Sequence, residues 1–443
     1  MRLLSTLILA VPLLAVSVTS SHDAHACGGC FVSQTESTQV TGHRMILAVS
    51  QTQTTLWDQI TYDGDPADFA WILPIKGQVD IELSSDALFE TLDQITQVQI
   101  LSPVIQCTPP PICGDEDFAA GGSSGTGGNE GGVVVIAQEV VGPYATVQLS
   151  AADPMALKNW LTDNNYNVPA DVQPVVDKYQ AEGFDFLALK LIPTAGINSM
   201  RPVRVTSQGA MPILPLRMVA AGTGAITPIS LWVFGEGRYE PGNFPYFTVN
   251  ADDLTWNWDT SKSDYSTIRQ AAFDKELGKV WHMESAEPFS MWQLDPIRWL
   301  AESSPKESGY ADANGQGAVE SCDADLATLT AGMNEQALWV TKLHADLPRS
   351  ALATDLEVGA SADQSAVSHI LEVSKTVGTP PACPTFPPCP DETETNSWDG
   401  FWSDDSASGK GGGCAMGGST GVPAVAGLLG LAAAVTLVRR RRR

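Results

Sequence analysis

The two ends of the chain carry apolar segments, and these restrict the compartment in which the rest can fold. Arg2 precedes an apolar run over residues 3–18, and a polar stretch then leads to Ala26. A positive start, a short apolar core and small residues before a cleavage point are typical of an export signal. We expect cleavage between Ala26 and Cys27. Acylation of Cys27, as in a lipoprotein, is an alternative, although Ala24 stands where such signals usually have a large aliphatic residue.

The other end of the chain has the features of a membrane anchor. Residues 422–438 are apolar or small, and the arginine cluster 439–443 follows them. This run would span about 25 Å as a helix, near the lower limit for crossing a bilayer, and the arginines favour the cytoplasmic side. We expect a transmembrane helix over residues 422–438, and a plain single-pass anchor is one interpretation of it.

A second interpretation rests on the residues before that helix. Gly412, Gly413, Cys414 and Ala415 precede the small-residue segment and the arginine cluster, and this order resembles the MYXO-CTERM sorting tail of myxobacteria. The resemblance implies that a sorting protease of the membrane cuts at Cys414 and leaves the protein on the cell surface. The protein is therefore expected to be exported to the cell envelope and anchored in the membrane through its C-terminus.

The charge of the chain restricts its partners. The sequence has 25 Lys and Arg against 51 Asp and Glu, a formal net charge of −26 at pH 7. Phosphate recognition needs clustered basic side chains, and this charge repels polyanions, so we expect no nucleic acid as a partner. With 43% hydrophobic residues and 12 Trp, the segment between the two ends can bury a large core.

Cysteine spacing predicts disulfides, because an exported chain meets oxidising conditions. Cys107 and Cys113 flank one short proline-rich segment, and Cys383 and Cys389 flank another. The spacing favours two local pairs that close these loops, but the connectivity stays open.

Three further cysteines form an odd set once Cys414 is assigned to the anchor. Either Cys30 pairs with Cys322 while Cys27 is acylated, or one thiol stays free. Cys27-x-x-Cys30 has no second Cys or His pair, so no closed zinc site is predicted. Two glycines at a chain start also lack the helix N-terminus that redox pairs use. We expect no metal and no cofactor.

Apolar patterning predicts an α+β, β-rich fold of mostly antiparallel sheets with a few packed helices, besides the C-terminal transmembrane helix. Ser85 is the expected N-cap of the first helix, and the run 69–73, stopped by Pro74, is typical of a buried strand. The predicted helices cover residues 84–95, 153–161, 171–180 and 265–280. The predicted strands cover residues 38–47, 53–62, 69–73, 133–136, 145–149, 184–192, 201–206, 213–220, 229–234 and 339–343.

Low-complexity segments divide the chain. The glycine-rich tract 119–132 cannot contribute to a core and is interpreted as a surface insertion. Residues 375–413 are rich in Pro, Gly and acidic residues and are interpreted as a stalk. We therefore expect a signal peptide over 1–26, an ectodomain over 27–374, this stalk, and a sorting tail over 414–443.

Aromatic and glycine motifs recur along the expected ectodomain. The most specific is Phe-Ala-Trp-Ile-Leu-Pro at residues 69–74. The others are Ala26-Cys27-Gly28-Gly29, Tyr62, Gly64, Pro66, Trp160-Leu161, Tyr166, Pro169, Tyr179, Gly183-Phe184 and residues 339–343. Over roughly residues 26–360 this set resembles the DUF2330 family of exported bacterial proteins. The resemblance implies no catalytic residues, because none are established for the family. The chain departs from the family at Cys30 and in the glycine-rich insertion.

Candidate catalytic residues are scattered. His43, His282, His344 and His369 lie far apart in the sequence, and no nucleophile elbow, His-Glu-x-x-His or phosphate-loop motif occurs. A Ser/His/Asp site could therefore be assembled only in space.

Two classes of function are carried forward. The first, which we favour, is a non-enzymatic binding or structural module of the cell surface, whose partners are the sorting protease and an envelope glycan or protein. Trp256 and Trp258, two apart on an expected strand, would share one face and could stack on a sugar. The alternative is a secreted hydrolase. A pocket in which His282 or His344 meets a Ser or Asp favours the hydrolase, and an exposed tryptophan pair without such a pocket favours binding.

Overall fold

The structure, a computed structural model, describes part of the chain. The described residues are 30–32, 39–63, 69–108, 140–141, 143–150, 155–164, 166, 172–191, 201–220, 225–312 and 314–386. Outside them lie the expected cleavage site at Ala26 and Cys27, the insertion 119–132, Cys113, Cys389, the side chain of Cys30, and the tail with Cys414 and residues 422–438. None of the helices in the described ranges is long and apolar enough to cross a membrane.

The described part of the chain is a β-rich mixture of strands and seven α-helices, and most strand pairs are antiparallel. The coarse fold class expected from the sequence is therefore confirmed. The α-helices are α1 (Asp86–Thr96), α2 (Ala156–Asp163), α3 (Gln173–Ala181), α4 (Leu216–Val219), α5 (Tyr265–Lys275), α6 (Asp295–Ser303) and α7 (Ala318–Leu329). Short 3-10 helices are η2 (Ala251–Asp253), η3 (Met291–Leu294), η4 (Glu335–Ala337) and η5 (Ala351–Ala353).

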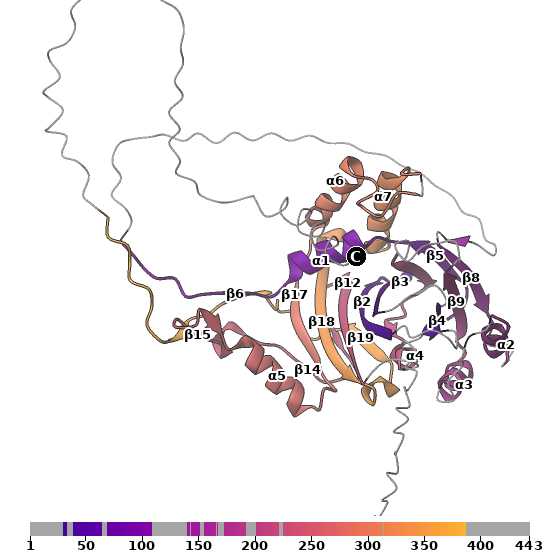
Figure 1. The fold of residues 1–443 in the computed structure, drawn as a ribbon, viewed down its shortest axis with the longest axis horizontal. Coiled ribbons are helices and arrows are strands. Elements are labelled where there is room, and N and C mark those ends of the chain that lie inside the picture. Colours follow the sequence, from indigo (N-terminus) through magenta and orange to yellow (C-terminus); the bar gives the residue numbers. More distant parts are fainter. Residues whose placement is uncertain are drawn as a thin grey trace, which may run out of the picture. The chain divides into compact units, whose positions relative to one another are not determined.

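The larger of the two main sheets has eight strands in the order β14-β17-β18-β12-β2-β3-β10-β5, and Figure 1 shows β17, β18, β12 and β2 side by side. Within this sheet, only β2 with β12 and β14 with β17 pair in parallel. The strands are β2 (Gln39–Val49), β3 (Gln53–Asp63), β5 (Val79–Leu83), β10 (Val203–Gln208), β12 (Ile226–Glu236), β14 (Tyr246–Phe247), β17 (Trp281–Pro288) and β18 (Leu338–Pro348). A tight turn joins β2 to β3, where the Ser50 hydroxyl accepts a hydrogen bond from the Gln53 amide at 3.1 Å.

The second main sheet has five antiparallel strands in the order β1-β4-β9-β8-β7. These are β1 (Cys30–Val32), β4 (Phe69–Ile75), β7 (Val140–Val141), β8 (Tyr144–Leu149) and β9 (Asp185–Leu191). Leu73 faces the core between the two sheets, and Ile72 faces a second core on the opposite side. Burial on both faces explains why the sequence of β4 is apolar without alternation, as predicted for a buried strand.

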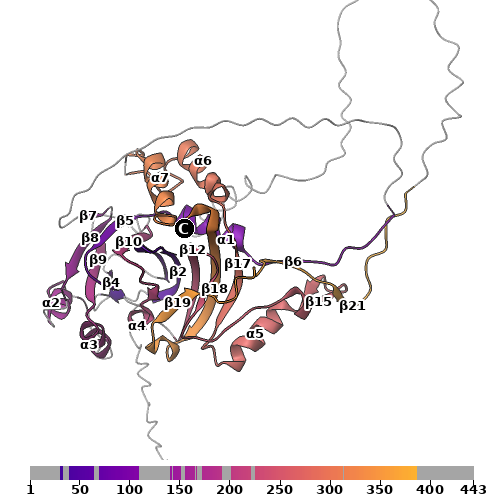
Figure 2. The ribbon, with the colours of Figure 1, turned by 180° about the vertical axis from the view of Figure 1, so that it is seen from behind.

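Helices cover the outer faces of both sheets, so the elements are stacked in four layers. α1, α6 and α7 pack on the eight-stranded sheet through residues such as Phe89 and Leu326. α2 and α3 pack on the five-stranded sheet through Leu157 and Tyr179, and both lie outside β8 and β9 in Figure 2. As predicted, Ser85 caps α1: its hydroxyl accepts a hydrogen bond from the Ala87 amide at 3.1 Å.

Three small sheets complete the described fold. One contains β11 (Ile213–Leu214), β19 (Leu356–Ala360) and β13 (Tyr239–Pro241). Another contains β16 (Lys262–Ser263), β15 (Thr255–Asn257) and β21 (Lys375–Val377), and the last pairs β20 (Ile370–Glu372) with β6 (Gln99–Leu101). Residues 375–377, interpreted from the sequence as the start of a stalk, thus belong to a sheet.

Several elements differ from the sequence predictions. The strand predicted over 213–220 is a two-residue strand followed by α4, because Pro215 interrupts it and cannot donate to a sheet. The helix predicted to reach residue 280 ends at Lys275, where Leu277 and Gly278 take positive φ angles that terminate helices. Neither α6 nor α7 was among the helices predicted from the sequence.

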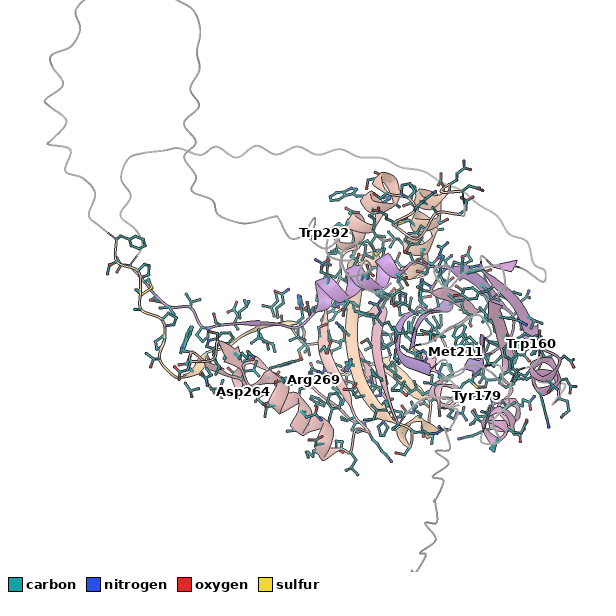
Figure 3. The ribbon with its side chains drawn as sticks, viewed as in Figure 1. Trp160, Tyr179, Met211, Asp264, Arg269 and Trp292 are labelled. Atoms are coloured by element: carbon teal, nitrogen blue, oxygen red, sulfur yellow. A yellow bond between two sulfur atoms is a disulfide. The ribbon has the colours of Figure 1, made fainter. Side chains whose placement is uncertain are left out.

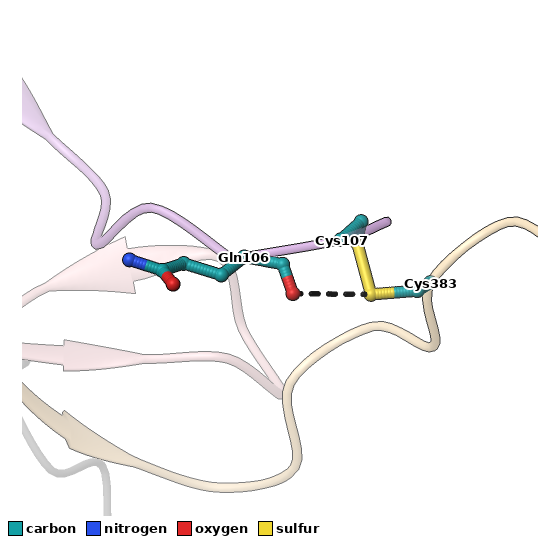
Figure 4. Close-up of a disulfide and its surroundings, with 3 residues drawn as sticks. All are labelled: Gln106, Cys107 and Cys383. Atoms are coloured by element: carbon teal, nitrogen blue, oxygen red, sulfur yellow. Dashed lines mark hydrogen bonds between the residues drawn. A yellow bond between two sulfur atoms is a disulfide. The ribbon is translucent and has the colours of Figure 1, made fainter. Parts of the chain in front are cut away.

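The disulfide pattern also differs from the expected local pairs. Cys107 is joined to Cys383 across a sequence separation of 276, with Cα atoms 5.4 Å apart, beside the carbonyl of Gln106 (Figure 4). The two proline-rich segments are therefore linked to each other at these positions. Cys322 is a free thiol buried in α7, and burial, more than the neighbouring carboxylates, raises its pKa to about 12. Such a thiol is unreactive at neutral pH.

Candidate functional site

An open cleft of about 470 Å³ lies beside α3, α4 and β19. It is called the Arg217 cleft below. Its lining comes from several segments that are distant in sequence: Lys76, Lys178, Glu182, Phe184, Ile213, Arg217, Thr354, Asp355 and Glu357. Because the lining includes three basic and three acidic side chains, the cleft is far less acidic than the chain as a whole.

Arg217 is the centre of the cleft. It lies on the short helix α4, whose backbone amide at Arg217 donates to Asp355 Oδ1 at 2.9 Å. Its side chain donates from Nε to Asp355 Oδ2 at 2.8 Å and from Nη1 to Glu182 Oε1 at 2.9 Å. Its guanidinium also lies 4.1 Å from the centre of the Tyr179 ring. Arg217 therefore binds two carboxylates and stacks on an aromatic ring, which uses the planar geometry specific to arginine.

The ionisable groups around Arg217 are held in single charge states. The hydrogen bond from Arg217 is the main reason that the pKa of Glu182 lies below its usual value. Burial, together with Asp355, raises the pKa of Tyr179, whose hydroxyl donates to Asp355 at 2.6 Å. Burial alone would lower the pKa of Arg217, but the hydrogen bonds to Glu182 and Asp355 raise it. Each pKa is therefore displaced away from neutrality.

Two lysines stand at the mouth of the cleft. Lys76 follows β4, and its ammonium lies 4.4 Å from the centre of the Phe184 ring. Lys178 lies in the last turn of α3. Both side chains are exposed, and both lower the pKa of Glu182 through their charge. Neither has a carboxylate within ion-pair distance in the part of the chain that the structure describes. They are therefore available to a ligand.

A second group of polar side chains crosses the outer face of the eight-stranded sheet. Strand register places Gln59, Arg44, Ser230, His344 and His282 in one row over β3, β2, β12, β18 and β17. Arg44, Ser230 and His344 are half-buried. The row therefore remains partly open to solvent.

Within this row a serine, a histidine and an aspartate meet. Ser230 Oγ lies 3.3 Å from His344 Nδ1, and His344 Nε2 lies 3.4 Å from Asp346 Oδ1. The hydrogen bond from His344 lowers the pKa of Asp346, and Arg269 (Figure 3), 3.7 Å away, acts in the same direction. A histidine so placed can accept the serine proton while the aspartate stabilises the imidazolium. The backbone amides in the middle of these strands are hydrogen-bonded within the sheet and are not free to stabilise an oxyanion. Stabilisation of the oxyanion would therefore depend on a cation such as Arg44, which is opposite Ser230 on β2.

Among the described residues, the other three candidate histidines make no hydrogen bond to a serine. His282 stacks on Phe247 at 4.7 Å, and burial, ahead of nearby cations, lowers its pKa to about 3. His43 is buried between the sheets with Nδ1 3.1 Å from Asp58, and His369 pairs with Glu287. Of the two histidines suggested by the sequence for a hydrolase, only His344 is placed beside a nucleophile.

The tryptophans expected to stack on a ligand are half-buried. Trp256 and Trp258 meet edge to face with ring centres 6.1 Å apart, and Trp256 packs on a small core that contains Leu254. The more exposed pair is Trp292 (Figure 3) and Trp299, at 70% and 65% exposure. Within the described ranges, no group of three His, Cys, Asp or Glu side chains is placed to hold a metal ion.

Sequence reasoning missed the residues of the Arg217 cleft. Arg217 interrupts the apolar segment 213–220, and a charged residue in such a segment signals a buried ion pair. Tyr179 was noted only as part of the family motif. Asp355, 138 residues from Arg217, carries no local signal of its role.

Comparison with known proteins identifies a family but no activity. The family model described as "Uncharacterized protein conserved in bacteria (DUF2330)" matches residues 21–358. No curated protein and no solved structure matches the chain.

Proposed function

From the premise that this chain belongs to the DUF2330 family, we propose that it is an exported, cell-surface-tethered binding module that holds its ligand in the Arg217 cleft. The cleft carries this proposal. Its volume of about 470 Å³ falls in the range of ligand sites, and charged groups converge on an apolar patch there, as is usual for such sites.

The ion pairs at the floor support binding rather than acid–base catalysis. A general acid or base needs a pKa near the working pH. Glu182, Tyr179 and Arg217 are all displaced away from neutrality, so none is poised to exchange a proton. Their hydrogen bonds instead fix the cleft walls before a ligand arrives, which lowers the entropy lost on binding.

The sequence of the two ends supports export and tethering. The apolar run 3–18 and the tail 414–443 have the composition of an export signal and a sorting tail. The Cys107–Cys383 bond is of a kind that persists in oxidising compartments. Mass spectrometry of the protein recovered from its host envelope tests this. A form that starts at Cys27 and ends near Cys414 is expected, whereas one that retains residues 422–443 would mean a plain membrane anchor.

Hydrogen exchange on the mature protein tests the binding site. With a solubilised envelope fraction present, slower exchange is expected at residues 178–184 and 354–357. Thr354→Trp, which fills the cleft, should abolish the protection, and Thr267→Trp on the exposed face of α5 should not. Protection that is absent, or confined to other segments, would refute the proposal.

Hydrolysis at Ser230 is a second candidate function, favoured by the Ser230–His344–Asp346 contacts. Ser230 Oγ would attack an acyl carbon and pass its proton to His344, which returns it to the leaving alcohol before water releases the acid. A fluorophosphonate probe tests this: an Oγ–P bond forms, the P–F bond breaks, and the serine proton leaves through His344. Labelling at Ser230 that falls roughly a hundredfold in His344→Gln is expected. Ser303→Ala is the control variant and should keep the labelling at Ser230. Absence of labelling at Ser230 excludes the activity.

A further inference from the structure

We propose that the Arg217 cleft binds a short peptide through its free C-terminal carboxylate, which Lys76 and Lys178 receive at the mouth. This inference rests on the proposed binding function and assigns its ligand class. It depends on the balance of charge in the cleft, on the apolar wall between the charges, and on the acceptors at the opposite side.

The charges in the cleft leave two cations for a ligand. Arg217 already donates to both Glu182 and Asp355, so its positive charge is fully used. Lys76 and Lys178 have no such partner within the described residues and share only the partly exposed Glu182. A ligand carboxylate placed between the two ammonium groups would gain charge-assisted hydrogen bonds.

The same lining selects against more highly charged ligands. Glu182, Asp355 and Glu357 all border the cavity. A phosphate or a polyanion would bring two or more charges close to these carboxylates, and like charges at short range are unfavourable. A single carboxylate matches the two available lysines better.

The walls suit a peptide rather than a bare anion. Phe184 is buried beneath Lys76 and Ile213 is half-buried, so the apolar surface next to the lysines comes mainly from Ile213. The opposite side of the cleft is formed by Thr354 and by Glu357 of β19, and the Thr354 hydroxyl and the Glu357 carboxylate are both exposed there. They can accept hydrogen bonds from peptide N–H groups or from a terminal ammonium.

Calorimetric titration of the mature protein with Ala-Leu-Ala tests the carboxylate. The probe is compared with the same peptide bearing a C-terminal amide, which differs only in the charged group. The acid is expected to bind at least about tenfold more tightly than the amide, as is typical of charge-assisted contacts, and added salt should weaken the acid more than the amide. Equal affinity for acid and amide would overturn the inference.

Variants at the mouth test the two lysines. Lys76→Gln and Lys178→Gln should each weaken binding of the acid about threefold to tenfold and leave the amide unchanged. Lys158→Gln, on the exposed face of α2, is the matched control and should have no effect. Unchanged affinity in both cleft variants contradicts the assignment.

The two proposals fail in different ways. If the envelope fraction protects residues 178–184 and 354–357 but neither peptide binds at millimolar concentration, the cleft is a binding site and the peptide class is wrong. If the envelope fraction gives no protection either, the binding function itself is refuted.

Discussion

Two buried clusters in this fold contain the same residue types but have different roles. In the Arg217 cleft, Arg217 pairs with Asp355 and Glu182 beside Tyr179. The other cluster, called the Asp325 cluster, lies between α7 and the eight-stranded sheet. There Arg204 pairs with Asp325 and with Glu82, beside Tyr310.

The Asp325 cluster is closed to solvent except at Glu82, whose side chain is 51% exposed. Asp325 has no exposed surface and accepts hydrogen bonds from Trp57 at 2.7 Å, Ser84 at 2.5 Å, Tyr310 at 2.7 Å and Arg204 at 2.9 Å. Five groups, from α7, β3, β10 and two loop positions, thus satisfy one another, and none of them lines the Arg217 cleft. The cluster fastens α7 to the sheet.

The Arg217 cleft has the same chemistry on an open wall. Asp355 is buried and Glu182 is 40% exposed, much as Glu82 is in the other cluster. Here, however, Lys76 and Lys178 border a cavity and have no carboxylate at ion-pair distance among the described residues. The comparison indicates that a buried Arg–Asp–Tyr group does not identify a site. What distinguishes the cleft is the cavity and the unsatisfied charge next to it.

The largest effect is expected from Asp325→Ala. The substitution leaves Arg204 without its buried partner and three further donors, Trp57, Ser84 and Tyr310, without their acceptor, which should cost about 3 to 5 kcal/mol of unfolding free energy. Urea unfolding measures it. Asp323 lies on the same helix as Asp325 and pairs with Arg298 at the surface. Asp323→Ala should therefore cost less than about 1 kcal/mol of unfolding free energy. Equal losses would mean that the cluster is not what fastens α7.

Asp355→Ala should have a smaller effect on stability. Arg217 keeps Glu182 and is close to the solvent of the cleft, so a loss of about 2 kcal/mol is expected. Because the cleft wall loses its anchor, peptide binding should also be lost. A stability loss as large as that of Asp325→Ala would show that the cleft floor is as essential to the fold as the Asp325 cluster.

Tyr179→Phe separates stability from binding. It removes one hydrogen bond to Asp355, at a cost of about 1 kcal/mol, and Tyr310→Phe is the matched change in the Asp325 cluster. Tyr179 does not line the cavity, so ligand affinity should stay within about twofold. A larger loss of affinity by calorimetry would extend the binding site beneath its present floor.

The smallest effect is a pH dependence at Glu182. Arg217 holds the pKa of Glu182 below its usual value of 4.5, so the native state favours the ionised form. The resulting stability is present above the unfolded pKa, near 4.5, and is lost as pH falls through the lower folded pKa. Because Glu182 is partly exposed, the contribution should be under about 1 kcal/mol. In Glu182→Gln, the free energy of unfolding should depend less on pH in this acid range. An unchanged pH dependence would argue against the Arg217–Glu182 ion pair.

The sequence predicted local elements better than the sites. Ser85 and the apolar face behind it specify α1, and residues 69–73 specify the buried strand β4, because these signals are contained within one element. α7 was missed because its buried positions include Asp325 and Cys322, which do not read as an apolar stripe.

The sites could not be predicted because they depend on long-range pairing. Asp355 is 138 residues from Arg217, and His344 is 114 residues from Ser230. Only the strand order of the sheet places His344 next to Ser230. The disulfide is similar: proximity in sequence favoured Cys107 with Cys113, and the fold brought Cys383 to Cys107 instead.

The position of that disulfide has a mechanical consequence for a tethered protein. Beyond Cys383 the chain continues toward the C-terminal tail, and β21 and β20 precede it. A pull on the tail would, without the cross-link, be carried by the peeling of these short strands one after another. With the cross-link, part of the load passes from Cys383 directly to Cys107 and the chain that leads back to β6. The tension is then divided between two paths, so a pull on the C-terminal end of the chain would load the fold at two points.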